Sequence, residues 1–540
     1  MKKILSLMLS GLLLTGCAGP VADVSRPSAE TVPSQMQTYR APVYNSRFDS
    51  VTEIFLSDKE VLHNSPQKSA VFTSHDIIYY EDRDIYESGN PYGEGTDADK
   101  HTAEEAAAHT VVNITSPGAY RITGKLSAGQ IRIDLGADSR EDPNAVVELI
   151  LSNADITCTV APAILFLNTY ECDENWSADT AKPDVDTSAA GASLILEGEN
   201  TISGSYVAKI YKDIDGEKKL WKQDGAIYSY MSTNVFGPGS LELNAENEGL
   251  DTELHLTVNG GNITINSDND GINTNEDGVS VTTINGGILN IFAGLGTEGD
   301  GIDSNGYLVI NGGTVVSSAN PGADAGLDSD LGSYVNGGTV IAFGSTMDWA
   351  ESKSGQVTMN LQFSSQQKAG SKITLTREDG TEFFSFDSEA EHARTFSGMI
   401  LSHPGLTQGE TYHVYVDGVQ MAYSGNDVGR GPGGMRGGFG HGKMPKDFDP
   451  ANLPEGETFP ADFDPAKFGF KGQRPEGMTP PEGFDGEPPE GETFPGGELP
   501  EMPEGGFRET GNGSMQEGES STEFYMNDMV NSFSGVNAAQ

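Results

Sequence analysis

Short apolar stretches alternate with polar residues along most of the chain, and one pattern recurs four times between Glu248 and Ala350. Each copy reads Gly, then Leu or Ile, then Asp or Asn, then Thr or Ser, then Glu, Asn or Asp. The copies begin at Gly249, Gly271, Gly301 and Gly326, at spacings of 22, 30 and 25 residues. This period is typical of one coil of a solenoid and is shorter than a globular domain.

The residue types indicate which kind of solenoid this is. Each copy is followed by an apolar residue and Asn-Gly-Gly, which begin at Asn259, Asn285, Asn311 and Asn336. The surrounding stretches are short and β-branched, with glycine pairs as corners and no helical periodicity. The sequence therefore predicts an all-β protein whose fold is a right-handed parallel β-helix.

Strand alternation assigns the side chains of the repeated phrase. The Leu/Ile column and the Thr/Ser column are expected to face inward, and the acidic and amide columns outward. The predicted outward residues are Asp251, Asn273, Asp303 and Asp328 in one column and Glu253, Asn275, Asn305 and Asp330 in the other. Carboxylates on coils about 4.8 Å apart repel by about 1 kcal/mol in water and by about 3 to 4 kcal/mol at an effective dielectric of 20. Because no Lys or Arg lies between Gln223 and Ser352, this face is expected to bind cations.

Length and charge narrow the class of partner. The chain has 540 residues, 68 glycines and a formal net charge of −48. Such a charge argues against nucleic acid and anionic lipid as partners. The alternatives left open are multivalent cations or a solvated acidic surface, and the in-register repetition of the acids favours cations. The chain is expected to be a monomer.

The first 17 residues form a predicted lipoprotein signal peptide. Two lysines precede an apolar stretch, and Leu14-Thr15-Gly16-Cys17 resembles the lipobox, in which Cys17 is lipidated and becomes the mature N-terminus. Residues 18–105 are interpreted as a tether and N-terminal segment. The protein is therefore expected to be extracytoplasmic and attached to the membrane through its lipid anchor, since no other stretch is apolar enough to span a bilayer.

Cys158 and Cys172 are the other cysteines, and a disulfide between them is the favoured prediction for an exported protein.

Domain boundaries follow from shifts in composition. Residues 106–354 are predicted to form the β-helix, and residues 355–425 either its final coils or a small antiparallel β cap. Between residues 426 and 520, Pro, Gly and Glu dominate, and PEGETFP occurs twice, so this segment is predicted to be disordered. Residues 521–540 regain apolar alternation and are predicted to form an edge strand.

The repeated phrases also resemble a known family. Asp-Gly-Ile-Asn-Thr-Asn at Asp270, Asp-Gly-Ile-Asp-Ser-Asn at Asp300 and the Asn-Gly-Gly corners are similar to those of bacterial carbohydrate-binding β-helix proteins, some of which bind polygalacturonate with calcium on a fold like that of pectate lyases. The resemblance implies Ca²⁺ as the cofactor, adds Asp270 and Asp300 to the metal ligands, and implies a binding protein. Ala325 departs from the pattern, because an acid is expected before that glycine; Asp324 is a candidate substitute.

Two classes of function remain open, together with a purely structural surface protein. The first is binding of acidic, pectin-like polysaccharide through Ca²⁺ held by oxygen ligands. The second is a lyase or hydrolase on the same fold. A lyase needs a basic residue near the substrate, and the nearest basic stretch is Lys209 to Lys222. A hydrolase needs a pair of acids about 6.5 to 9.5 Å apart. Such a pair is normally unique, whereas these acids recur in every coil.

Overall fold

The computed structural model describes residues 40–80, 98–173, 181–214, 217–345, 347–387, 394–428 and 520–539. All of them belong to one unit, Tyr39–Gln540. Cys17, most of the tether and nearly all of the segment predicted to be disordered lie outside the described residues. In the described part of the chain, no helix is both long and apolar enough to cross a membrane.

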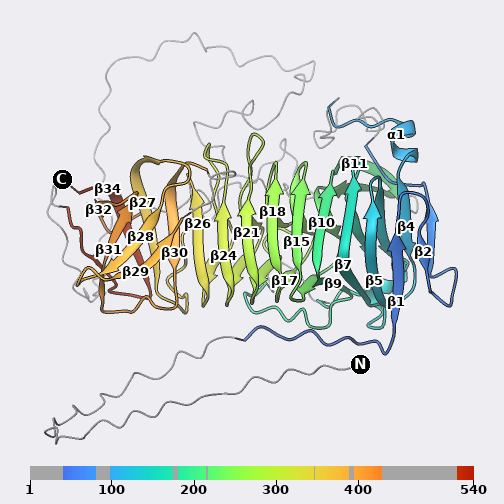
Figure 1. Ribbon diagram of the computed structural model, residues 1–540, viewed down its shortest axis with the longest axis horizontal. Coiled ribbons are helices and arrows are strands. Elements are labelled where there is room, and N and C mark those ends of the chain that lie inside the picture. Colours follow the sequence, from blue (N-terminus) through green and yellow to red (C-terminus); the bar gives the residue numbers. More distant parts are fainter. Residues whose placement is uncertain are drawn as a thin grey trace, which may run out of the picture. The chain divides into compact units, whose positions relative to one another are not determined.

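Strands dominate this unit, which confirms the all-β prediction, and they recur in groups of three (Figure 1). From β13 to β21, each strand pairs in parallel with the strand three places later. Three parallel ladders result, and each coil contributes one strand to each ladder. The right-handed parallel β-helix itself stays a prediction.

The first ladder carries the repeated phrase. It contains β4 (Thr110–Ile114), β6 (Gly129–Asp134), β8 (Ile164–Asn168), β13 (Gly225–Ser229), β16 (Glu248–Thr252), β19 (Ile272–Thr274) and β22 (Ile302–Ser304).

The second ladder contains the four strands that run into the Asn-Gly-Gly corners and two strands stacked before them. They are β9 (Ala192–Glu197), β14 (Thr233–Phe236), β17 (Leu256–Val258), β20 (Val281–Ile284), β23 (Tyr307–Ile310) and β25 (Gly332–Val335).

The third ladder follows the corners. It contains β10 (Glu199–Gly204), β15 (Ser240–Ala245), β18 (Asn262–Ser267), β21 (Ile288–Phe292), β24 (Thr314–Ser318) and β26 (Thr339–Gly344). Three earlier strands, β1 (Val51–Leu56), β5 (Gly118–Leu126) and β7 (Val147–Cys158), begin this stack, and β7 pairs with both β9 and β10.

The first ladder has the register that the repeat implies. Asp251 pairs with Asn273, and Asn273 with Asp303. The fourth phrase lies outside a named strand but continues the stack, because the Asp328 amide donates to the Ile302 carbonyl at 2.8 Å. The acidic and amide residues of the four copies are therefore neighbours in space.

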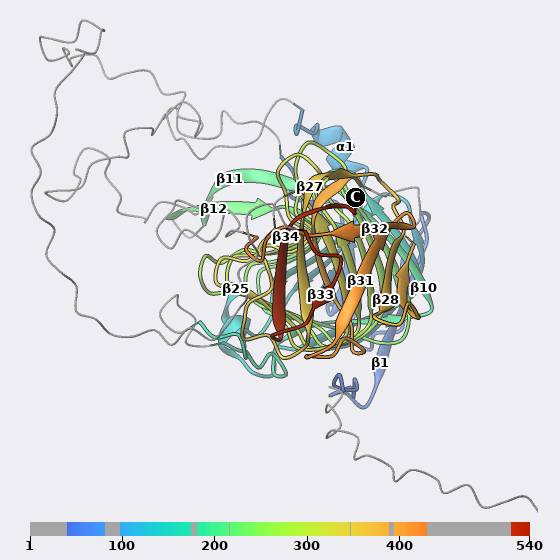
Figure 2. The same ribbon diagram turned by 90° about the vertical axis from the view of Figure 1, so that its left-hand side faces the viewer.

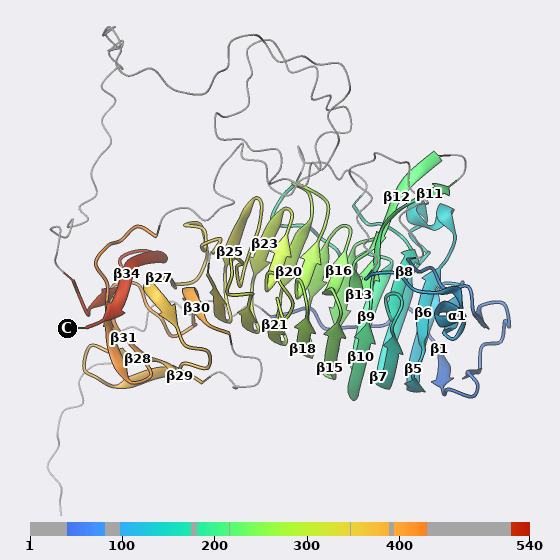
Figure 3. The same cartoon turned by 90° about the horizontal axis from the view of Figure 1, so that it is seen from above.

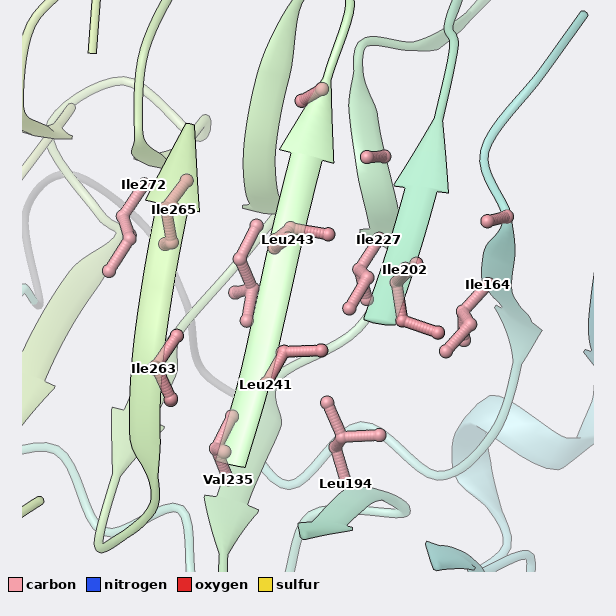
Figure 4. Packing of buried hydrophobic residues seen from close by; sticks show 14 of the residues in the cluster. Ile164, Leu194, Ile202, Ile227, Val235, Leu241, Leu243, Ile263, Ile265 and Ile272 are labelled. Carbon is pink, nitrogen blue, oxygen red and sulfur yellow. The ribbon is translucent and has the colours of Figure 1, made fainter. Parts of the chain in front are cut away.

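Stacked aliphatic side chains fill the interior between the ladders. Ile227, Leu243, Ile265 and Ile272 are buried and point inward from all sides (Figure 4). The phrase glycine is required by the closeness of the next coil: a Cβ at Gly271 would lie 2.6 Å from the Gly301 carbonyl oxygen. The corner glycine is required by its conformation, since φ is +92° at Gly287.

The C-terminal end of the stack is covered by an antiparallel cap, which corresponds to one of the two predicted alternatives for residues 355–425. The strand β30 (Phe396–Ser402) runs antiparallel to β26 and to β27 (Thr358–Gln367). Figure 2 shows the cap strands facing the viewer. The remaining strands are β28 (Ile373–Arg377), β29 (Glu382–Phe386), β31 (Thr411–Val416), β32 (Val419–Ala422), β33 (Phe524–Tyr525) and β34 (Val530–Ala538).

The last strand, β34, lies inside this cap rather than at an edge. It pairs in parallel with β27 and antiparallel with β32. Just before it, the Ser521 amide donates to the Tyr423 carbonyl at 2.9 Å, and the Tyr423 amide donates back at the same distance. The cap has its own aromatic core, where Phe533 contacts Tyr423 and Phe524.

The N-terminal end begins earlier than expected, since β1 already pairs with β5. The strand β2 (Leu62–His63) pairs antiparallel with β1, and β3 (Val71–Ser74) pairs antiparallel with β4. A short helix, α1 (Ala103–Ala107), follows and starts at a capping box between Thr102 and Glu105.

The predicted disulfide is wrong in this structure, because both cysteines are free thiols. Cys158 ends β7 and belongs to the aliphatic core, whereas Cys172 follows β8 in a partly exposed loop. Burial raises the pKa of each thiol to about 12, so neither is a reactive thiolate at neutral pH.

Candidate functional site

The acidic columns of the first ladder point away from the aliphatic core but are less exposed than expected. Asp251 is 1% exposed, Asn273 7% and Asn275 6%, while Asp303 and Asp328 are half-buried and Asp330 is exposed. The expectation of an open outer face is therefore wrong for the first half of the ladder. A hairpin of β11 (Val207–Ile214) and β12 (Glu217–Gln223) rises beside it (Figure 3).

Three carboxylates converge at the start of the ladder. Asp224, immediately before β13, Glu248, the first residue of β16, and Asp251 each offer an oxygen, and these oxygens lie within 4.8 Å of one another. Asn273 follows Asp251 in register on β19. These four residues are called the upstream cluster.

Several oxygens of the upstream cluster are buried without a partner. Within the described residues, Glu248 Oε2, Asp251 Oδ2 and Asn273 Oδ1 have no hydrogen-bond partner. Burial and the charge of Asp224 raise the pKa of Glu248, and burial and the charge of Glu248 raise the pKa of Asp251 well above its usual value. Such groups are costly unless a proton or a cation compensates them.

One side chain from outside the repeat supplies part of this compensation. Lys222, near the end of β12, places its Nζ 3.0 Å from Asp224 Oδ2 and donates to Asn275 Oδ1 at 2.6 Å. Burial alone would lower the pKa of Lys222, but Asp224, Glu253 and Asp251 outweigh it and raise this pKa well above the usual value. The expectation that the ladder contains no basic residue therefore needs correction.

Other predicted residues tie the upstream cluster together. The Asn275 amide donates to Asp251 Oδ1, and the Tyr228 hydroxyl donates to Glu253 Oε1. Asp270 accepts a hydrogen bond of 2.7 Å from the Asp300 amide and so connects this region to the next coils.

A second group of acids lies further along the chain and comprises Asp300, Asp303, Asp328 and Asp348; it is called the downstream cluster. Burial and the charge of Asp328 raise the pKa of both Asp300 and Asp348 to about 8. The same two causes raise the pKa of Asp303 well above its usual value. In the described part of the chain, no ion pair reaches any of the four.

The edge of the downstream cluster is more open. Asp330 is the exposed acid at this edge, and partial desolvation by its neighbours together with the charge of Asp328 raises its pKa to about 6. Asn305 donates to the Asn275 carbonyl at 2.8 Å and to Asp277 Oδ1 at 3.1 Å, so it is held as a structural amide. In the coil where Ala325 replaces the expected acid, the Ala325 amide donates to Asp300 Oδ1, and Asp324 accepts from the Gly299 amide.

The sequence-based prediction missed Asp224, Glu248 and Asp348 as site residues, and it considered Lys222 only as the end of a basic stretch that could supply a lyase with its base. A signal existed for two of them, because Asp224 and Glu248 precede a glycine as Asp270 and Asp300 do. Asp348 follows the last phrase, and its amide approaches the Leu327 carbonyl at 3.4 Å. Lys222 carries no repeat signal, since the hairpin that positions it is an insertion between coils.

Comparison with known proteins places the chain among carbohydrate-binding domain-containing proteins. A family model described as "Carbohydrate-binding domain-containing protein" matches residues 108–381, slightly more than half of the chain. The chain therefore belongs to this family of carbohydrate-binding domain-containing proteins.

Comparison with curated proteins gave no match. Among solved structures, a polysaccharide lyase-like protein from C. thermocellum, studied as a gadolinium derivative, aligns with 21% identity and a TM-score of 0.32 over 54% of this chain and 93% of its own.

Proposed function

We propose that this protein is a surface lipoprotein that binds acidic polysaccharide, such as polygalacturonate, through Ca²⁺ held on the first ladder of a right-handed parallel β-helix. The observation that carries the proposal is the upstream cluster, with three convergent carboxylates and buried oxygens that lack partners in the described structure. Membership of the carbohydrate-binding family supports a polysaccharide as the ligand.

The residues of the upstream cluster fit a calcium ion. Ca²⁺ takes about six to eight oxygen ligands, and Asp224, Glu248, Asp251 and Asn273 offer side-chain oxygens at one place. The three acids carry three negative charges and Lys222 one positive charge. One divalent cation would therefore neutralise the cluster.

The downstream cluster is the better place for contact with polymer. Its acids are half-buried, and Asp330 beside it is exposed, so a bound cation would keep coordination positions open to outside ligands. The carboxylates of a uronate polymer are ligands of the type that Ca²⁺ prefers. Without a cation, the raised pKa values show that these acids repel further negative charge.

A lyase is the second candidate, because Lys222 lies beside the acids. A general base works best when its pKa is near the operating pH, whereas the charges around Lys222 raise its pKa. Its ammonium is held between Asp224 and Asn275. This geometry suits charge compensation better than proton abstraction.

Retention on immobilised polygalacturonate with calcium and with chelator tests the binding function. The wild type should be retained only with calcium, and Asp303→Asn should weaken retention. Glu242→Gln is the matched control, because Glu242 is an exposed acid on the third ladder. Equal retention in chelator would refute the metal bridge, and absorbance from unsaturated products would establish a lyase instead.

The lipid anchor has a separate test. Replacing Cys17 by serine should release the protein from the membrane fraction or leave it unprocessed, as followed by fractionation. Unchanged membrane association of Cys17→Ser would refute the lipoprotein assignment without affecting the calcium site.

A further inference from the structure

A groove of about 510 Å³, lined by both polar and apolar side chains, runs across the second ladder, on a different face of the coils from the acidic clusters. Its floor crosses five stacked strands, β14, β17, β20, β23 and β25. All five belong to the part of the chain that the carbohydrate-binding family model covers.

Two columns of side chains in register form the floor. The first column is Asn234, Thr257, Thr283, Val309 and Tyr334. The second, two residues further along each strand, is Phe236, Asn259, Asn285, Asn311 and Asn336. The floor thus contains amides, hydroxyls and apolar or aromatic groups, and neither column contains a charged residue.

The asparagine column is fixed but keeps hydrogen-bonding capacity. Asn285 Nδ2 donates to Asn259 Oδ1 at 2.9 Å, and Asn311 Nδ2 donates to Asn285 Oδ1 at 3.0 Å. Each amide nitrogen uses one N–H in this ladder, so a second N–H remains for an acceptor in the groove. The donors are therefore pre-positioned at the spacing of the coils.

The walls set the charge that the groove accepts. Asp184 and Asp186 line one wall, and Lys353 lies at the far end. Hydrogen bonding from Ser188 lowers the pKa of Asp186, which keeps it charged. Because the walls carry two acidic residues and one basic residue, they disfavour binding of a polyanion in the groove.

The wall that contains Asp184 and Asp186 also closes the groove at its β14 end. The Thr187 hydroxyl is hydrogen-bonded to Asn234 and Thr257. Towards the other end the groove opens, because Tyr334 is half-buried and Asn336 is exposed. Tyr307 lies beside Tyr334, with ring centroids 6.1 Å apart, so the open end offers an aromatic platform.

We propose that this groove binds a linear neutral polysaccharide, independently of calcium. Strands in the floor lie about 4.8 Å apart, which is close to the length of one pyranose ring along an extended chain, so each strand can contact one sugar residue. Tyr334 stacks against a ring face, while Thr283 and the asparagine amides bind hydroxyl groups. This inference rests on the carbohydrate-binding part of the proposed function and not on its metal site.

Calorimetric titration of the full chain in chelator tests the proposal, with cello-, xylo- and manno-oligosaccharides as probes. At least one neutral oligosaccharide should bind. Tyr334→Ala should weaken its binding about tenfold, which is the effect expected for loss of an aromatic contact. Thr283→Val, which keeps the shape of the side chain, should also weaken it.

Controls separate the groove from general damage and from the acidic face. Thr264→Val, on the outer face of β18 in the third ladder, should leave binding unchanged, and both groove variants should retain calcium-dependent binding of polygalacturonate. If no neutral oligosaccharide binds in chelator, the groove proposal fails even where polygalacturonate binding succeeds. Pro42 also lines the groove, so if binding appears only after residues 1–43 are removed, the groove accommodates the protein's own chain and the proposal is overturned.

Discussion

The first and second ladders are built from the same coils, but stacking has opposite electrostatic effects on their polar side chains. On the first ladder, stacking places Asp300, Asp303 and Asp328 beside one another, and burial and the charge of Asp328 raise the pKa of both Asp300 and Asp303. On the second ladder, stacking places Asn259, Asn285 and Asn311 so that each amide satisfies the next. Stacking in register therefore makes carboxylates on neighbouring coils repel one another, whereas it lets amides on neighbouring coils hydrogen-bond to one another. The acidic face therefore needs a proton or a cation to compensate its charge, and the amide face does not.

Removal of calcium should have the largest effect, because it should destabilise the acidic face and leave the amide face unaffected. A ligand present at a hundred times its Kd stabilises the folded state by about 2.7 kcal/mol, which corresponds to roughly 5 °C in Tm per site for a large domain. Scanning calorimetry with calcium and with chelator should show this difference. Polygalacturonate binding should disappear in chelator while groove binding persists. An unchanged Tm would mean that the acidic face is compensated without metal.

Lys222→Met should have the next largest effect. Removing one partner of a buried ion pair costs about 3 kcal/mol or more, and here it leaves Asp224 without its cation. The expected result is a marked loss of stability in chelator that calcium partly restores, together with tighter calcium binding. Lys125→Met, which removes a partner of the exposed ion pair with Asp155, is the control and should change Tm little.

Asp251→Asn should change the melting temperature in opposite directions with calcium and with chelator. The substitution keeps the shape of the side chain and removes one buried negative charge, so the variant should melt higher than the wild type in chelator. With calcium, it should melt lower, because a ligand is weakened. Glu242→Gln should change neither temperature, and a variant that is less stable in both conditions would mark Asp251 as purely structural.

The pH dependence of stability should be smaller but diagnostic. Asp300 and Asp348 have their pKa raised from 3.8 to about 8 in the folded state. The stability that comes from their protonated forms is complete below about pH 4 and is lost as pH rises through about 8. In chelator, Tm should therefore fall over this range. Calcium should flatten the fall, whereas a fall that calcium does not alter would place these acids outside the metal site.

The repeat made part of this arrangement predictable. The identity of the columns, such as Asp251 with Asn273 and Asp303, follows from counting residues between glycines, because a parallel stack transmits register from coil to coil. The resemblance to the family added Asp270 and Asp300, which are acids directly before the phrase glycine. Applied consistently, that pattern would also have found Asp224 and Glu248.

What lay outside the repeat was not predictable. The hairpin that delivers Lys222 is an insertion, and no period relates it to the ladder. The burial of the outward columns follows from such additions, which strand alternation does not describe. The asparagines were interpreted only as corners, because a sequence shows that a turn occurs but not that successive turns line a groove.

The pairing of β34 inside the cap has a consequence for proteolysis. The backbone of Tyr423 is bonded to that of Ser521, so the chain between them leaves and returns at the same place. A protease that cut this connection once would leave the C-terminal piece attached by the β27 and β32 pairings and by Phe524 and Phe533 in the aromatic core. The nicked protein would run as one species in a native gel and as two chains after denaturation.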